Sequence, residues 1–131
     1  MRYLLDTHVA VWAVNDDTRL SRNARAAIAD PGNMIAVSLA SAWEIAIKNN
    51  LGRSVREPFG MTVAEALGEF RAAEFELLAI DHAAIAQVET LPRLHGDPFD
   101  RLLVASALAG DWQFVTHDRR FADYGDFVLL V

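Results

Sequence analysis

The stretch RYLLDTHVAVWAV, residues 2–14, decides the fold class of this chain. Its first residues, Arg2 to Leu5, form a short run that predicts a buried strand, and the Asp6-Thr7 pair after it predicts a turn. The residues from His8 to Val14 are typical of a short helix. A strand followed at once by a helix is the repeating unit of α/β proteins, and the start of the chain therefore favours that class.

The same alternation continues to the end of the chain. Continuous apolar runs predict further strands at residues 33–38, 75–80, 112–116 and 127–131. Periodicity and capping residues predict helices at 21–29, 38–51, 62–73, 81–91 and 98–110, with a helical turn at 119–124. Strands of this kind are typical of a parallel sheet covered by helices on both faces. With 131 residues and no linker, we expect one α/β domain over residues 1–131.

The composition excludes several kinds of chemistry. The chain has no cysteine, so disulfides, zinc–thiolate sites and cysteine nucleophiles are ruled out together. A net charge of −6 argues against a sequence-independent nucleic-acid binder, which usually needs a basic face, but it is compatible with an acidic pocket that holds cations. No signal peptide and no apolar run of membrane-spanning length are visible, so we expect a soluble, cytoplasmic protein.

Acidic side chains follow the predicted strands at the edge where parallel sheets bind ligands. Asp6 follows the first strand, Glu44 lies on the helix after the second, and Asp118 follows the strand at 112–116. Each has a structural alternative: Asp6 as a helix cap, Asp118 as a turn former, and Glu44 in a capping box with Ser41 or in an ion pair with Lys48. The positions of these acids are therefore compatible both with a binding site and with purely structural roles.

The stretch DPFDRLLVASA, residues 97–107, adds two more acids at the start of the most apolar helix. Asp97 precedes Pro98 and fits an N-cap. Asp100 shares a helical face with apolar residues of the same helix, and we expect it to point inward.

Several carboxylates that converge cannot all stay ionised without a cation between them, and oxygen-only ligands suit Mg²⁺ or Mn²⁺. Such ions polarise phosphoryl oxygens and activate water, which favours hydrolysis of phosphate esters.

Four segments together resemble the PIN-domain ribonucleases, most closely the VapC-type toxins of type II toxin–antitoxin pairs. They are LLDTH at 4–8, SAWEIAIK at 41–48, DPFDRLLVASA at 97–107 and FVTHD at 114–118. The resemblance implies that Asp6, Glu44, Asp100 and Asp118 are the catalytic acids and metal ligands. It also implies a compact Rossmann-like fold, Mg²⁺- or Mn²⁺-dependent endonuclease action on RNA, and inhibition by a cognate VapB-like antitoxin. A homodimer, and a heterotetramer or larger assembly with the antitoxin, is implied as well.

Further residues are candidates for supporting roles. Thr7, Asp97 and Thr116 are expected beside the acids, and Arg101, Arg119 and Arg120, with Arg53 and Arg56, are candidates to hold the RNA backbone. His8 and His117 stay open between phosphate contact, proton transfer and a surface position.

Two other functions and one surface remain open. A catalytically silent binding module is one alternative. An aspartyl-phosphate phosphohydrolase is the other, although His8 stands where that chemistry usually has a second acid, and no lysine follows a later strand. For an antitoxin we consider the surroundings of Trp12, Val14 and Leu20 and the stretch 63–75, with burial in the core as the competing explanation.

Overall fold

A computed structural model of the chain describes residues 1–94 and 96–131, and it contains a five-stranded sheet in which every neighbouring pair is parallel. The strand order is β3-β2-β1-β4-β5. The strands are β1 (Arg2–Leu5), β2 (Met34–Ser38), β3 (Glu76–Leu78), β4 (Gln113–Thr116) and β5 (Val128–Leu130). The predicted parallel sheet is therefore confirmed.

The helices also follow the prediction, with shifts of at most one residue at their ends. They are α1 (Thr7–Val14), α2 (Arg22–Ala29), α3 (Leu39–Leu51), α4 (Val63–Ala72), α5 (His82–Thr90) and α6 (Pro98–Gly110), with a 3₁₀ helix, η1, at Arg119–Tyr124. The strand expected at 75–80 is shorter than predicted. β3 is an edge strand whose pairing with β2 covers three residues, so the backbone of 79–80 has no strand to pair with.

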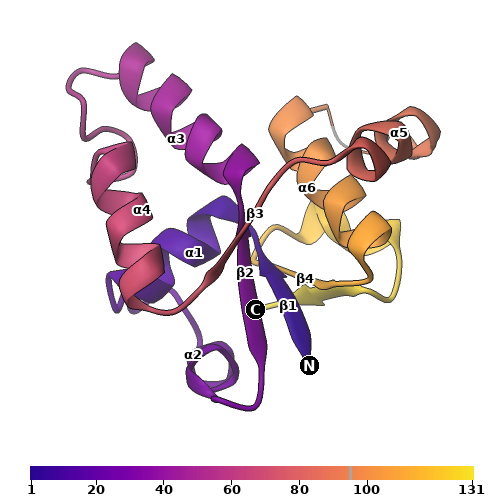
Figure 1. Cartoon of the computed structure of the whole chain (residues 1–131), viewed down its shortest axis with the longest axis horizontal. Helices are drawn as coiled ribbons and strands as arrows, with labels where there is room; N and C mark the ends of the chain where they lie inside the picture. The colour runs from indigo at the N-terminus through magenta and orange to yellow at the C-terminus, as the bar shows by residue number, and fades with distance from the viewer. Residues whose placement is uncertain (95) are drawn as a thin grey trace.

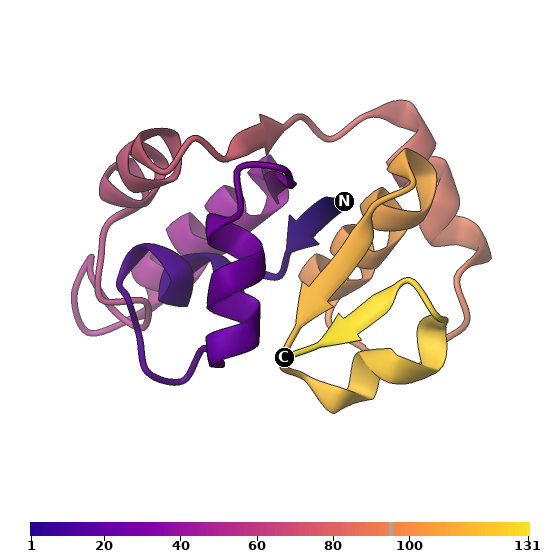
Figure 2. The same ribbon diagram turned by 90° about the horizontal axis from the view of Figure 1, so that it is seen from below.

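Helices cover both faces of the sheet, as the pattern predicted (Figure 1). Leu5 of β1 packs into a core with α1, α2 and α4, whereas Leu4 packs into a second core with α6 on the other face. Figure 2 shows the same division from below, with α5 and α6 together on one side. Alternate residues of one strand are thus buried in opposite directions, which explains why the strand sequences are mostly apolar and do not alternate with polar residues.

The order in which the chain adds strands to the sheet reverses at β1, in the middle of the sheet. From β1 the chain builds outward through β2 to β3, then returns to the other side of β1 to build β4 and β5. In open α/β sheets, ligands bind beyond the carboxyl ends of the strands at such a point. Here Asp6 follows β1 and Asp118 lies two residues beyond β4, on either side of this crevice.

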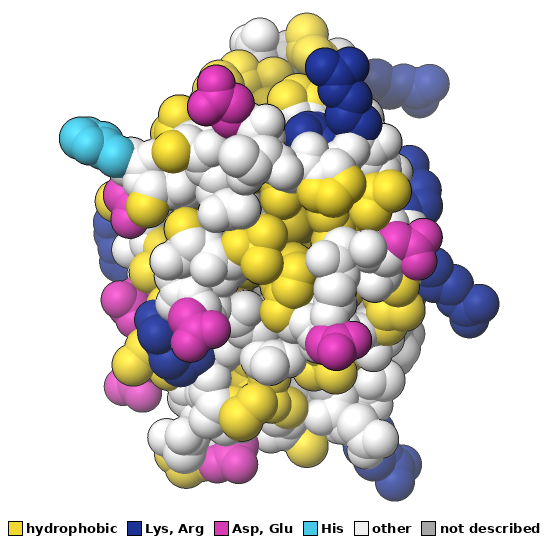
Figure 3. Space-filling view, turned by 90° about the vertical axis from the view of Figure 1, so that its right-hand side faces the viewer, with side chains coloured by type: hydrophobic (Ala, Val, Ile, Leu, Met, Phe, Trp, Pro, Cys, Tyr) yellow, Lys and Arg dark blue, Asp and Glu magenta, His cyan; other side chains and the backbone are white. Residues whose placement is uncertain are grey.

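Part of the partner surface that we considered near Trp12 and along 63–75 is buried in the core, which was the competing explanation. Trp12 and Leu20 are 7% and 4% exposed, and Phe70 is fully buried, because these side chains pack together in the core on this face of the sheet. Exposed large apolar side chains occur instead on α3 and around α5 and α6: Leu39, Trp43, Ile47 and Leu51, and Ile85, Leu94 and Leu108. Figure 3 shows the face over α5 and α6, where apolar side chains gather between scattered charges.

The helices are short. The longest, α3 and α6, have 13 residues each, and no helix in the described part of the chain is long and apolar enough to cross a bilayer.

Candidate active site

All five acids singled out in the sequence line one pocket of about 260 Å³. They come from the ends of β1 and β4 and from the first halves of α3 and α6. The pocket is lined by Asp6, His8, Glu44, Lys48, Asp97, Asp100, His117, Asp118 and Arg120. The parallel sheet brings these residues together because the carboxyl ends of its strands meet at one edge.

Asp6 is buried at the start of α1 and is held by both of its oxygens. Its Oδ1 accepts a hydrogen bond from the backbone N–H of Thr7 at 2.7 Å, and its Oδ2 accepts one from Thr116 Oγ1 at 2.6 Å. Burial raises the pKa of Asp6, and the charge of Glu44 raises it further, while these two hydrogen bonds oppose the rise. The side chain is therefore fixed in position but is costly to ionise.

Glu44 is only 2% exposed and has two hydrogen-bond donors. Thr7 Oγ1 donates to Oε1 at 2.7 Å and also lies 2.8 Å from Ser41 Oγ, and Lys48 Nζ donates to Oε2 at 2.5 Å. The capping-box alternative for Glu44 is wrong, because α3 begins at Leu39 and its N-cap is Ser38. The ion pair with Lys48, the other structural alternative, is present.

Asp97 and Asp100 lie closer to Glu44 than the sequence alone indicated. One carboxylate oxygen from each of these three acids lies within 4.8 Å of the others, which is the spacing of ligands around one metal ion. Asp97 is also the N-cap of α6, as predicted, and its Oδ1 accepts from the N–H of Phe99 at 2.9 Å.

Asp100 is the acid whose ionisation the pocket opposes most clearly. Burial raises its pKa to about 8, and the charges of Asp6, Asp97 and Glu44 act in the same direction. A group of this kind stays neutral near pH 7 unless a cation compensates it, so the pocket is prepared for a positive charge.

Asp118 lies on the far side of the crevice and is partly exposed. Its carboxylate caps η1 by accepting from the N–H of Arg120, and the guanidinium of Arg120 donates to both of its oxygens at 2.7 to 3.1 Å. The N–H of Asp118 in turn donates to Thr116 Oγ1 at 3.1 Å. Thr116 thus links the acids that follow β1 and β4.

Two histidines form an aromatic wall of the pocket. His8 and His117 are exposed, with ring centroids 6.2 Å apart; His8 lies against Phe59 at 5.2 Å and His117 against Trp12 at 4.5 Å. Partial desolvation by the surrounding protein lowers the pKa of His8, an effect that Asp6 and Glu44 oppose. Both residues line the same pocket as the acids, so contact with a substrate phosphate stays open for each.

The arginines predicted to hold RNA differ in their surroundings. Arg101 donates to the carbonyl oxygens of Pro92 at 3.0 Å and Val88 at 3.5 Å, and so supports the end of α5. Arg120 pairs with Asp118 at the pocket, and Arg119 is exposed beside it. An RNA contact by any of them stays a prediction, and Arg120 is the one of the three that lines the pocket.

An aromatic pair, Trp43 and Phe99, lies between α3 and α6, close in the sequence to three of the acids. Trp43 is 56% exposed, and its ring meets that of Phe99 edge to face at 5.1 Å. Trp43 directly precedes Glu44, and Phe99 lies between Asp97 and Asp100. Sequence reasoning missed this pair because an aromatic residue on an apolar helix is more often buried in the core.

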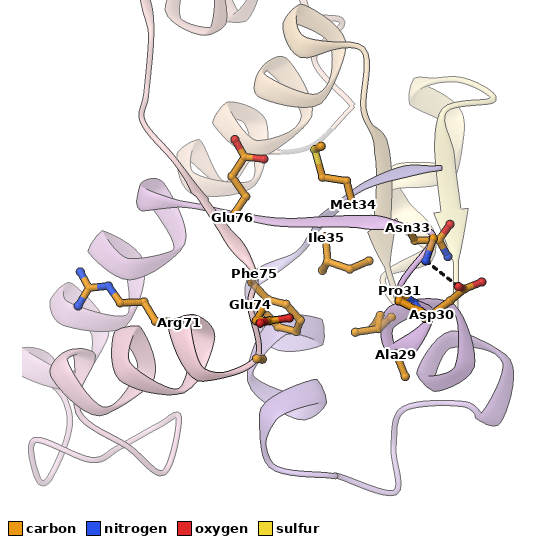
Figure 4. A pocket seen from close by; sticks show the side chains of 13 residues that line it. Ala29, Asp30, Pro31, Asn33, Met34, Ile35, Arg71, Glu74, Phe75 and Glu76 are labelled. Atoms are coloured by element: carbon orange, nitrogen blue, oxygen red, sulfur yellow. Dashed lines mark hydrogen bonds between the residues drawn. The ribbon is translucent and has the colours of Figure 1, made fainter.

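A larger hollow of about 700 Å³ lies at the opposite end of the sheet (Figure 4). It is formed where β2 and β3 begin, and Figure 4 shows Arg71 and Glu74 near one side of it and Asp30 and Asn33 near the other. Its acids do not form a metal-like group among the described residues. The smaller acidic pocket is therefore the candidate active site.

The fold and the pocket together define a class of protein. The PIN domain family matches residues 3–126, so the chain belongs to the PIN-domain family, and the resemblance stated from the sequence is confirmed. Among curated proteins, it is similar to Ribonuclease VapC22 of Mycobacterium tuberculosis, with 34% identity over 122 residues that cover 92% of this chain and 90% of that protein.

Solved structures agree on the fold. VapBC2 from Rickettsia felis, bound to a DNA fragment from its promoter, is similar with a TM-score of 0.72 and 20% identity, over 100% of this chain and 98% of that chain. DNA-bound VapBC from Salmonella typhimurium gives a TM-score of 0.65 at 13% identity, over 100% and 97%. The PIN-like α/β fold that we expected is therefore confirmed.

Proposed function

We propose that this chain is a metal-dependent endoribonuclease that acts as the toxin of a toxin–antitoxin pair. The observation that carries the proposal is the cluster of Glu44, Asp97 and Asp100, flanked by Asp6 and Asp118, at the strand ends of a PIN-family fold. A homologue named as a ribonuclease, similar over nine-tenths of both chains, supports the same reaction.

The donor set of the pocket fits Mg²⁺ or Mn²⁺. It offers carboxylate oxygens and no thiolate, as these hard cations prefer. We assign Asp6, Glu44, Asp100 and Asp118 as the ligands, directly or through water, and the spacing of Asp97 makes it a fifth candidate. Such an ion stabilises charge on a phosphoryl oxygen and lowers the pKa of a bound water. Thr7 and Thr116 orient the buried acids, because each donates a hydrogen bond to one of them.

We infer that unpaired RNA reaches the acids past His8 and His117, which line the pocket, while the exposed ring of Trp43 on α3 meets a neighbouring base. Arg119 and Arg120 are the nearest candidates for backbone phosphates, and His8 and His117 face the same space. The exposed ring of Trp43, supported by Phe99, offers a flat surface on which a base next to the scissile phosphate can stack. Stacking would matter here, because it does not depend on positive charge and the chain is acidic overall.

Partners are proposed on two grounds. Structural neighbours of this fold were solved as VapBC assemblies, which supports a cognate antitoxin for this chain as well. The exposed apolar side chains of α3 and of the α5–α6 face offer surface that an antitoxin or a second copy would cover.

The test is cleavage of a labelled single-stranded RNA by antitoxin-free protein. We expect cleavage with Mg²⁺ or Mn²⁺ and none with EDTA, and we expect Asp6→Asn and Asp100→Asn to be inactive yet folded. Asp123→Asn, an exposed acid on η1, is the matched control and should cleave at the parent rate.

The alternatives give different results in this assay. Cleavage in EDTA would refute the metal mechanism, and no cleavage of any RNA under all metal conditions would favour a silent binding module. Hydrolysis of a phosphomonoester without RNA cleavage would favour the phosphohydrolase. If Asp100→Asn were active and Asp97→Asn inactive, Asp97 would replace Asp100 in the assigned set of metal ligands. A short upstream reading frame encoding a DNA-binding fold would support the toxin assignment.

A further inference from the structure

Lys48 is the single lysine of the chain, and it lies inside the acidic pocket. It is one turn along α3 from Glu44, and its Nζ donates to Glu44 Oε2 at 2.5 Å. The side chain of Lys48 is 36% exposed, whereas that of Glu44 is 3% exposed. Lys48 is therefore partly open to solvent, while the carboxylate that it contacts is buried.

The ammonium group interacts with the same three acids that form the metal-like cluster. It contacts Glu44 and lines the same pocket as Asp97 and Asp100. Partial burial lowers the pKa of Lys48, but the hydrogen bond to Glu44 and the acidic surroundings outweigh this and raise the pKa. Oxygens of Glu44, Asp97 and Asp100 lie within 4.8 Å of one another. Lys48 thus supplies positive charge at the place where a divalent cation is expected.

We propose that Lys48 is a resident counter-ion of the active site, which compensates the acids in the metal-free protein and competes with the divalent metal for them. The proposal rests on the metal-dependent function proposed above. Without this ammonium group, the buried carboxylate of Glu44 would have no ionic partner among the described residues. With a divalent cation also present, the two positive charges repel each other across a few ångströms.

The lysine stem allows this competition to be resolved. It is long and flexible, and its head group is partly open to solvent, so it can turn away from Glu44 without disturbing α3. Arginine at this position would keep the charge, and methionine would keep the length without the charge. Lys48 therefore sets the concentration of free metal at which the enzyme becomes loaded.

The experiment measures Mn²⁺ binding by isothermal titration calorimetry, without RNA and without a cleavage readout. We expect Lys48→Met to bind Mn²⁺ about tenfold more tightly than the wild type or better, because one positive charge has been removed from beside the metal. Lys48→Arg should stay within about threefold of the wild type. Arg71→Met, which removes the same charge at the opposite end of the sheet, should leave the affinity unchanged.

Thermal unfolding gives a second, independent readout. In EDTA, Lys48→Met should unfold at a lower temperature than the wild type, because Glu44 has lost its counter-ion, and Mn²⁺ should raise its midpoint by more than it raises that of the wild type. Lys48→Gln serves in the same role if Lys48→Met does not fold.

The outcomes separate this inference from the proposed function. If the wild type binds Mn²⁺ and the neutral variants bind it equally well or more weakly, the counter-ion role alone would be overturned. The same follows if Lys48→Arg tightens binding as much as Lys48→Met, since charge would not be the cause. If neither the wild type nor Lys48→Met bound Mn²⁺, both the inference and the metal site would be refuted.

Discussion

Removing the charge of Asp100 should stabilise the metal-free protein. The pKa of Asp100 is about 8 in the folded chain, against an ordinary value of 3.8. At pH 7 the unfolded chain carries an ionised Asp100 and the folded chain a neutral one, and this difference amounts to about 4 kcal/mol as an upper bound. Because the side chain is only half-buried and water screens it, we expect Asp100→Asn to gain about 1–2 kcal/mol, or roughly 3–8 °C in midpoint.

The pH dependence follows from the sign of the shift. The folded chain holds the Asp100 proton more tightly than the unfolded chain, so this contribution to stability is complete below about pH 4 and is lost as the pH rises through about 8. In EDTA, the wild type should therefore lose stability across this range, and Asp100→Asn should show a flatter profile.

Urea denaturation followed by circular dichroism, at several pH values in EDTA, measures both effects. Asp123→Asn is the control: it makes the same change on an exposed part of η1, and its stability should differ from the wild type by less than about 0.5 kcal/mol. With saturating Mn²⁺ the order should reverse, because the metal stabilises the wild type and binds the variant poorly. An Asp100→Asn protein that is no more stable than the wild type in EDTA would refute the view that this pocket opposes its own charges.

Two further predictions concern the residues around the acids. Thr116→Val removes the hydroxyl that donates to Asp6 Oδ2. It should lower the free energy of unfolding, measured by urea denaturation, by about 1–3 kcal/mol and weaken Mn²⁺ binding, measured by calorimetry. Thr116→Ser retains the hydroxyl and should keep the stability and the affinity of the wild type. Equal Mn²⁺ affinity in Thr116→Val would mean that Thr116 does not orient Asp6. Trp43→Ala should raise the KM for single-stranded RNA by about 5- to 100-fold with a smaller effect on kcat, while Trp43→Phe retains most of the affinity, because an exposed ring stacks on a base. An unchanged KM in Trp43→Ala would refute stacking and leave α3 as a protein-binding face.

The fold was accessible from the sequence because its signals are local. Each strand is a mostly apolar run, and each helix begins at a residue that can cap it, such as Ser21, Thr62 or Asp81, whose side chains accept the capping hydrogen bonds. The convergence of the acids followed from the same signals, since parallel strands bring their carboxyl ends to one edge. Neither step required knowledge of side-chain packing.

The parts that could not be predicted depend on how two helices meet. The approach of Asp97 and Asp100 to Glu44 is set by the packing of α3 against α6, and no spacing in the sequence encodes that distance, whereas the i,i+4 spacing did predict the pair of Glu44 and Lys48. The exposure of Trp43 and the burial of Trp12 have the same origin, because both lie on apolar helical segments and only the packing decides which one faces the sheet. Periodicity shows which residues share a face of a helix, but the tertiary packing decides whether that face is covered.

The structural and catalytic interpretations of these acids are not alternatives. Asp6, Asp97 and Asp118 each cap a helix, and the three helix starts converge on one pocket. A carboxylate has about four acceptor positions, so accepting a capping hydrogen bond does not exclude a cation at the same group. The cap fixes the side chain, and the positive end of the helix dipole favours its ionised form. Capping therefore suits these acids to the proposed metal ion, because it orients them before a cation arrives, and at Asp6 the hydrogen bond from Thr7 also opposes the rise in pKa that burial causes.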